Sequence, residues 1–190
     1  GRGRHARYLN KIGFKVTAAD ISIANIEFAK NFENEQLHFE LHDMRQQYPN
    51  RFDAVLNLFT SFGYFEDSDD DIRMVKSMVS SLSETGYGVI DFLNAEVAIQ
   101  QLVPREEKVV DGIHFMISRR FENKTIIKDI YFSDDGRQWH FTEKVKAFRK
   151  KDFEEYLFQA GARISNCFGN YDLDPFISGE SKRLILIFER

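Results

Sequence analysis

Hydrophobic positions follow two different periods along this chain. Up to Phe92, segments with an apolar residue every three or four positions alternate with short, nearly continuous apolar runs. The first pattern is typical of amphipathic helices, and the second of strands buried on both faces of a sheet. From about Lys108 to Phe148 the apolar residues recur at every second position instead, which indicates half-buried strands. The helical spacing then returns once before two final apolar runs.

The helical spacing predicts helices over about 4–12, 22–30, 69–82 and 151–160. The apolar runs predict strands over about 14–19, 38–41, 52–59, 87–92, 164–168 and 181–189. Strict alternation of strands and helices favours a parallel sheet with helices on both faces. No helix separates the last two strands, so we expect the final strand to be antiparallel. The predicted fold is therefore α/β, with a doubly wound, mostly parallel sheet in a single domain over 1–190.

The region of about 108–148 interrupts this alternation and predicts a small antiparallel insertion. Its apolar sets fall into three groups, separated by turn signals at 122–124 and 134–136, so we expect three strands. The insertion leaves the carboxyl end of the strand that ends near Phe92, and ligands of doubly wound folds bind at that edge. We expect its apolar sets to pack on the rest of the domain. The residues expected on its open side are His114, Arg119, Tyr131, His140 and Lys144.

The first residues of the chain are the strongest candidate for chemistry. Gly1 and Gly3 precede a predicted helix, and Asp20 follows the next strand. Glycines let the backbone approach a ligand closely, a helix start presents free N–H groups, and a carboxylate can accept hydrogen bonds from a ribose diol. The pattern predicts a nucleotide-type site, although it also fits a dinucleotide fold or a glycine turn without a ligand. In the last case Asp20 would simply cap the following helix together with Ser22.

Composition narrows the remaining possibilities. The chain has 190 residues, 43% of them hydrophobic, and 19 are Phe, which indicates a globular protein with a bulky core. Its net charge of −4 disfavours a nucleic-acid surface. A single cysteine, Cys167, excludes a disulfide framework within the chain, and the histidines do not follow a metal-ligand spacing. No run reaches membrane-spanning length, and we expect a cytoplasmic protein without a metal site.

Taken in order, these segments resemble a class I S-adenosylmethionine-dependent methyltransferase, of the small-molecule type with a β-insertion before its last helix. The resemblance covers nearly the whole chain, and no one of its motifs is specific alone. It rests on segments that match the family's motifs in order: Gly1-Arg2-Gly3-Arg4-His5, Asp20, Asp43-Met44, Asn57 to Tyr64, Ala160-Gly161-Ala162, Tyr171-Asp172 and Ser181-Lys182-Arg183.

The resemblance implies S-adenosylmethionine as cofactor and assigns roles around it. Gly1 and Gly3 would pass under the methionine part, Asp20 would bind the ribose hydroxyls, and Ile21 would pack on the adenine. Asp43 would accept from the adenine amino group while Met44 covers the ring. The remaining cofactor residues implied at the end of a strand are Asn57, Leu58 and Phe59.

The residues that would bind the methyl acceptor are less clearly indicated than those that would bind the cofactor. Phe62, Tyr64 and Tyr171 are candidates to line the acceptor pocket, with filling of the core as the alternative. His5, beside the glycine turn, is a weak candidate for a general base, and Tyr64 is a second weak catalytic candidate. The resemblance does not identify the methyl acceptor.

The chain departs from the family at its start. The family places its first, central strand and an acidic residue before the glycine turn, and neither precedes Gly1 here. We therefore expect that a first strand and an N-terminal segment are missing from the sequence as given. Without that strand, the strands on either side of it could not be bridged.

Two other functions fit parts of the pattern. A nicotinamide-dependent oxidoreductase would share the glycine turn, and a non-catalytic cofactor-binding or interaction module would share the acidic residues. The insertion, about 108–148, and the final antiparallel strand favour the methyltransferase. We expect the insertion to act as a wall or lid over the pocket of a small-molecule acceptor; an interface in a homodimer is the alternative.

Overall fold

The computed structural model describes all residues, 1–190, and contains five helices and ten strands. The helices are α1 (Arg4–Lys11), α2 (Ile23–Lys30), α3 (Ser68–Ser80), α4 (Ala95–Gln100) and α5 (Lys150–Gln159). The strands of the body are β1 (Val16–Asp20), β2 (Leu37–Leu41), β3 (Phe52–Asn57), β4 (Leu82–Leu93), β9 (Arg163–Phe168) and β10 (Arg183–Glu189). Those of the insertion are β5 (Arg105–Val110), β6 (Ile113–Glu122), β7 (Thr125–Asp134) and β8 (Arg137–Lys146).

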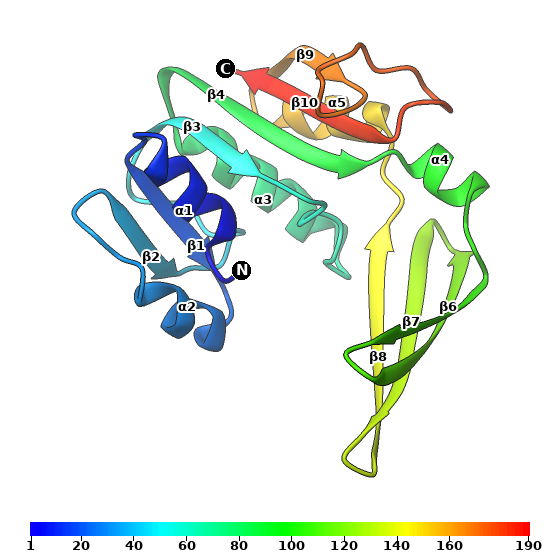
Figure 1. Ribbon diagram of the computed structural model, residues 1–190. Helices are drawn as coiled ribbons and strands as arrows, with labels where there is room; N and C mark the ends of the chain where they lie inside the picture. Colours follow the sequence, from blue (N-terminus) through cyan, green and yellow to red (C-terminus); the bar gives the residue numbers. More distant parts are fainter.

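The strands of the body form two groups. β1 and β2 pair in parallel, and a second sheet has the order β3-β4-β10-β9 (Figure 1). Within the second sheet β3 and β4 are parallel, while β10 is antiparallel to both β4 and β9. The predicted alternation and the antiparallel final strand are therefore confirmed. No strand pairs with the outer edge of β1 or of β3, so the two groups are not joined through backbone hydrogen bonds.

Each group has its own core. A cluster of 14 buried residues lies between the larger sheet and helices α3 and α5, which cover one face of it, and four phenylalanines are fully buried there: Phe62, Phe92, Phe153 and Phe188. A separate cluster of five residues holds α1 and α2 against β1 and β2. The group of β1, β2, α1 and α2 is called the N-terminal lobe. Because the two cores are separate, polar contacts do much to join this lobe to the rest of the body. Arg45, beyond β2, binds Asp70 on α3 at 2.7 Å, and the Ser77 hydroxyl donates to the Gln46 carbonyl at 2.6 Å.

The insertion has four strands, so the prediction of three was wrong. The order is β5-β6-β7-β8, all antiparallel, and the sheet extends from the body below α4 (Figure 1). β5 was missed because its sequence, Arg105-Glu106-Glu107-Lys108-Val109-Val110, is too polar to show an apolar alternation. The short helix α4 was missed as well.

The apolar face of the insertion is not covered as predicted. Trp139 and Phe141 are 43% and 51% exposed and stack with their rings 6.3 Å apart. Strand register places Arg119 opposite Lys128 and Glu143, on this same face, because side chains of one strand alternate between faces. Arg119 was therefore wrongly grouped with His114, Tyr131, His140 and Lys144, which lie on the other face.

A buried ion pair joins the insertion to the body. Lys146, at the end of β8, binds Asp71 of α3 with 2.5 Å between Nζ and Oδ2, and the Asp71 side chain is fully buried. The Lys146 N–H also donates to the Gly63 carbonyl at 2.8 Å. The insertion is thus fixed to the loop that follows β3. None of the helices is both long and apolar enough to cross a lipid bilayer.

Candidate functional site

The glycine turn before α1 faces the end of β1. The Asp20 carboxylate accepts from the Ser22 N–H at 2.7 Å and from the Asn25 side chain at 3.4 Å, and the backbone nitrogen of Gly1 lies against it. Burial acts to raise the pKa of Asp20, and the hydrogen bonds from Ser22 and Asn25 act to lower it. The structure therefore brings together Gly1 and Asp20, which are 19 residues apart.

The backbone conformation at position 3 and the neighbouring Phe39 ring require a glycine there, independently of any ligand. Its φ of +77° lies in the left-handed region, and a Cβ there would come within 2.5 Å of the Phe39 ring. Gly1 has no atom near its Cβ position. The tight turn expected at Gly3 is thus a packing requirement as well as a candidate ligand cradle.

The residues that follow β1 and β2 differ in how available their side chains are to a ligand. Ile21 is 68% exposed, so it is not a core residue and its side chain is available for a ligand. Asp43 is held by Arg45 through contacts of 2.6–3.1 Å, and these hydrogen bonds lower its pKa. Met44 packs on the larger core.

The segment after β3 makes an unusual turn. Phe59 and Thr60 both have φ of +57°, a conformation that side chains other than glycine rarely adopt. Before the turn, Asn57 is 9% exposed and its Oδ1 has no hydrogen-bond partner. A buried acceptor without a partner is costly, so Asn57 is suited to receive a donor from a bound ligand. The Leu58 carbonyl accepts from the Ser61 hydroxyl at 2.8 Å.

The turn places three predicted site residues in one row. The exposed ring of Phe59 stacks on His5 with 4.7 Å between ring centroids, and it lies 6.0 Å from the ring of Tyr171. These residues come from α1, the end of β3 and the loop between β9 and β10. No carboxylate hydrogen-bonds to His5, and its ring is held by the stacking contact with Phe59.

The two other acceptor candidates differ. Phe62 is fully buried and its ring packs 5.2 Å from Phe153, so it does not line an open pocket but fills the core, the alternative expected for it. Its neighbour Gly63 lets the chain turn Phe62 inward, and Tyr64 is turned outward at 49% exposure. Burial, and then the charge of Glu143 on β8, raise the pKa of Tyr64. Tyr64 therefore lies between the turn and the insertion.

A buried carboxylate behind this row was missed by the sequence reasoning. Asp91 of β4 is 2% exposed and accepts from the Phe59 N–H at 3.0 Å, from the Tyr171 hydroxyl at 3.1 Å and from Arg183 Nε at 2.8 Å. The available signal was an acid inside the buried run Gly88-Val89-Ile90-Asp91-Phe92. Charges are rarely buried without a partner, so this position required one.

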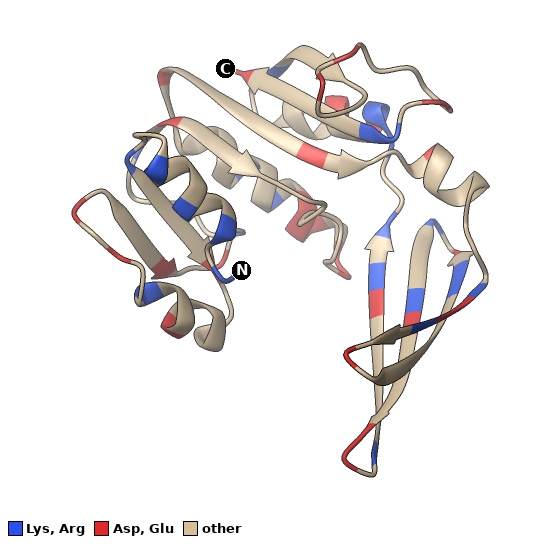
Figure 2. Ribbon diagram, in the orientation of Figure 1, with Lys and Arg blue, Asp and Glu red and all other residues tan.

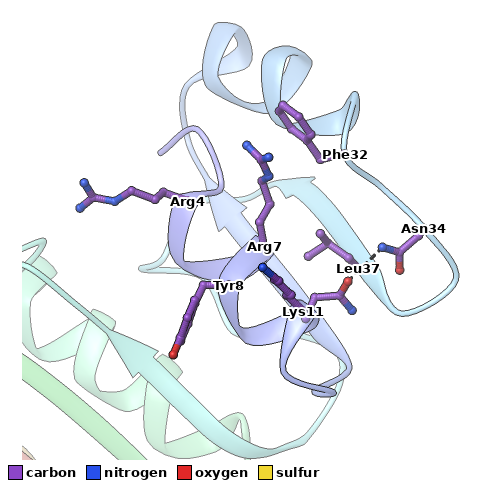
Figure 3. Close-up of a pocket in the computed structure, with 8 residues that line it drawn as sticks. Arg4, Arg7, Tyr8, Lys11, Phe32, Asn34 and Leu37 are labelled. Carbon is purple, nitrogen blue, oxygen red and sulfur yellow. Dashed lines mark hydrogen bonds between the residues drawn. The ribbon is translucent and has the colours of Figure 1, made fainter.

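A separate cavity of about 530 Å³ lies on the outer face of α1 (Figure 3). Arg4, Arg7 and Lys11 line it, and α1 carries no acidic residue (Figure 2). Arg7 lies over the Phe32 ring at 3.6 Å. None of the predicted site residues lines this cavity, and no group of three or more His, Cys, Asp or Glu side chains could hold a metal ion.

Comparison with known proteins agrees with this geometry. Residues 1–86 match the family described as the methyltransferase domain. A search of the curated proteins finds no match.

Solved structures match over the full length of the chain. An S-adenosylmethionine-dependent methyltransferase from Clostridium acetobutylicum is 20% identical with a TM-score of 0.86, and the match covers 100% of this chain and 80% of that one. The CcbJ methyltransferase from Streptomyces caelestis is 14% identical with a TM-score of 0.85, over 100% and 80% of the two chains. The sugar N-methyltransferase KedS8 from Streptoalloteichus is 19% identical with a TM-score of 0.80, over 100% and 76%. The chain therefore has the α/β fold of these proteins.

Proposed function

We propose that this chain is an S-adenosylmethionine-dependent methyltransferase and transfers a methyl group to a small-molecule acceptor, in keeping with the methyltransferase-domain match over residues 1–86. The observation that supports the proposal most directly is the convergence of the glycine turn, Asp20 and the turn after β3 beside exposed aromatic rings. When bound, the cofactor supplies an activated methyl group on a sulfonium, so the protein needs no catalytic triad.

The chain's own groups fit the cofactor. We assign the ribose hydroxyls to the Asp20 carboxylate, the adenine face to the exposed side chain of Ile21, and the adenine edge to Asp43 and Met44. The partnerless Oδ1 of Asn57 is suited to the cofactor's ammonium group, with Gly1, Gly3, Leu58 and Phe59 around the methionine part. These side chains bind and orient the reactants, and positioning accounts for much of the rate of an in-line displacement.

We place the acceptor between Phe59, Tyr64 and Tyr171. Two proteins of the same fold are described as a sugar N-methyltransferase and an amino pentose methyltransferase, which makes amino sugars the first acceptors to test. The contact between Gly63 and Lys146, with Tyr64 beside β8, supports the insertion as a wall of this pocket. The exposed aromatic face of the insertion supports a homodimer interface as a further role.

We also propose that the protein acts in the cytoplasm and not on nucleic acid, as its single cysteine and net charge of −4 favour. The activity is tested by isothermal titration with S-adenosylmethionine and with NADH, followed by turnover on a panel of amino sugars and small amines. Binding of NADH in place of S-adenosylmethionine would favour an oxidoreductase. Cofactor binding without turnover of any acceptor would favour a non-catalytic module.

A further inference from the structure

Both oxygens of the Asp91 carboxylate are engaged. Oδ1 accepts from Arg183 Nε at 2.8 Å and forms an ion pair with Nη2 at 2.6 Å, while Nη2 donates to the Thr60 hydroxyl. Oδ2 accepts from the Phe59 N–H at 3.0 Å and from the Tyr171 hydroxyl at 3.1 Å. Paired with a guanidinium and almost without solvent contact, this carboxylate accepts the hydrogen bond from Tyr171.

This arrangement fixes where the proton of Tyr171 lies. A phenol has one proton, and Asp91 can only receive it, so the O–H bond points into the protein. The Tyr171 oxygen is left with lone pairs and no donor toward its exposed side. The residue is 58% exposed and its ring lies beside Phe59, in the row of aromatic rings described above.

We propose that Asp91 is a positioning residue, which holds the Tyr171 hydroxyl so that its oxygen receives an N–H or O–H of the methyl acceptor. This inference rests on the proposed function and defines its substrate class. A neutral amine or a hydroxyl can donate to the Tyr171 oxygen and still keeps a lone pair to attack the methyl group, whereas a carboxylate has no proton to donate to that oxygen. Methyl transfer forms a bond from that nitrogen or oxygen to carbon and breaks the carbon–sulfur bond. The acceptor's proton is released to water.

Tyr171 does not take that proton itself. Partial burial raises its pKa, Arg183 opposes this, and the Asp91 charge and hydrogen bond raise it again, so the net direction is upward. The phenol therefore stays protonated at neutral pH and orients the acceptor without serving as the base.

The Asp91–Tyr171 bond can be tested without any acceptor. In protein labelled with 13C at tyrosine Cζ, a pH titration by NMR follows each phenol, and Tyr171→Phe assigns the signal. We expect Tyr171 to ionise above pH 10, and Asp91→Asn to lower that midpoint. A Tyr171 that titrates at its ordinary value in both proteins would overturn the inference.

The functional test compares Tyr171→Phe with Tyr87→Phe, a matched loss of a half-exposed hydroxyl in the middle of β4. The acceptors are a methyl 4-amino-4-deoxyglycoside, its 4-hydroxyl counterpart and the corresponding uronate. We expect turnover of the amine or the hydroxyl, and a loss of roughly tenfold in kcat/KM for Tyr171→Phe only, with S-adenosylmethionine affinity unchanged. Asp91→Asn should lose activity similarly, and the double variant should lose little more.

The outcomes separate the two claims. A wild-type protein that binds no S-adenosylmethionine contradicts the proposed function. A wild-type protein that methylates an acceptor, with Tyr171→Phe equal to wild type or with additive losses in the double variant, contradicts only the role of Asp91 and Tyr171. Methylation of the uronate carboxylate alone contradicts it as well.

Discussion

Replacing Lys146 by methionine should destabilise the protein by leaving a buried charge unpaired. Asp71 is fully buried, its Oδ1 has no partner, and its Oδ2 binds only Lys146, at 2.5 Å. Loss of one partner of a buried ion pair costs about 3–5 kcal/mol. We expect the lower end, about 3 kcal/mol, because the Lys146 side chain is 22% exposed and water can reach the vacated position.

The effect should depend on pH in a defined direction. Burial raises the pKa of Asp71, and Lys146 partly offsets this. Just above the unfolded value of 3.8, the native state therefore retains a proton that the unfolded state has released. This contribution to stability is present at low pH and lost as pH rises through the folded pKa, above which Asp71 is ionised and paired with Lys146. Without Lys146 the pKa of Asp71 rises further. The stability gap between variant and wild type should thus be largest near pH 7 and should narrow as pH falls toward 5.

Urea unfolding followed by circular dichroism measures the gap. With a slope of about 2 kcal/mol per molar urea, a loss of about 3 kcal/mol lowers the midpoint by about 1.5 M. Lys144→Met is the matched control, since Lys144 lies on the same strand and face and forms no ion pair. Equal midpoints for Lys146→Met and Lys144→Met, or a gap that does not change between pH 7 and pH 5, would refute the reasoning.

Three further predictions follow from other parts of the structure. Gly3→Ala should destabilise the N-terminal lobe by more than 1 kcal/mol, because φ is +77° and Phe39 occupies the Cβ position; Gly1→Ala, measured by the same thermal unfolding, should have little effect. Hydrogen bonds from Thr142, Arg120 and His140 lower the pKa of Asp129 to about 2. The stability that Asp129 gives the insertion is therefore present above the unfolded pKa of 3.8 and is lost as pH falls through about 2. Asp129→Asn should flatten this acid transition, which Trp139 fluorescence follows. Trp139→Ser with Phe141→Ser should turn a dimer into a monomer in sedimentation if the aromatic face is an interface, while Tyr131→Ser on the opposite face should not; a wild-type monomer rules out that interface.

Periodicity was sufficient for the order and type of most elements, because burial on one or both faces leaves a direct trace in the sequence. It could not supply strand pairing, so the polar strand β5 was not predicted. The unbridged edges of β1 and β3 were expected from the family resemblance and not from periodicity. The outward face of the insertion was also assigned wrongly. Apolar alternation shows that a strand has two unlike faces, but it does not show which one meets the body.

The same limit applies to the site. Residue type and the family resemblance predicted Gly1, Asp20, His5, Phe59 and Tyr171 as site residues. The structure places Gly1 against Asp20 and the Phe59 ring beside His5 and Tyr171, and their roles stay predictions. The supporting residues were missed because they act through long-range pairs. Asp91 and Arg183 are 92 positions apart, and Asp71 and Lys146 are 75 apart. An acid in a buried segment signals that a partner exists without identifying it.

The most direct test of the account is the affinity of wild type and of Asp20→Ala for S-adenosylmethionine by isothermal titration. Removing a carboxylate that binds a diol should cost roughly 1.5–3 kcal/mol, or about 10- to 150-fold in Kd, with the fold intact by circular dichroism. Asp135→Ala, at the tip of the hairpin between β7 and β8, is the control and should bind as wild type does. Equal affinity of Asp20→Ala and wild type, or no binding of S-adenosylmethionine by wild type, would contradict the account.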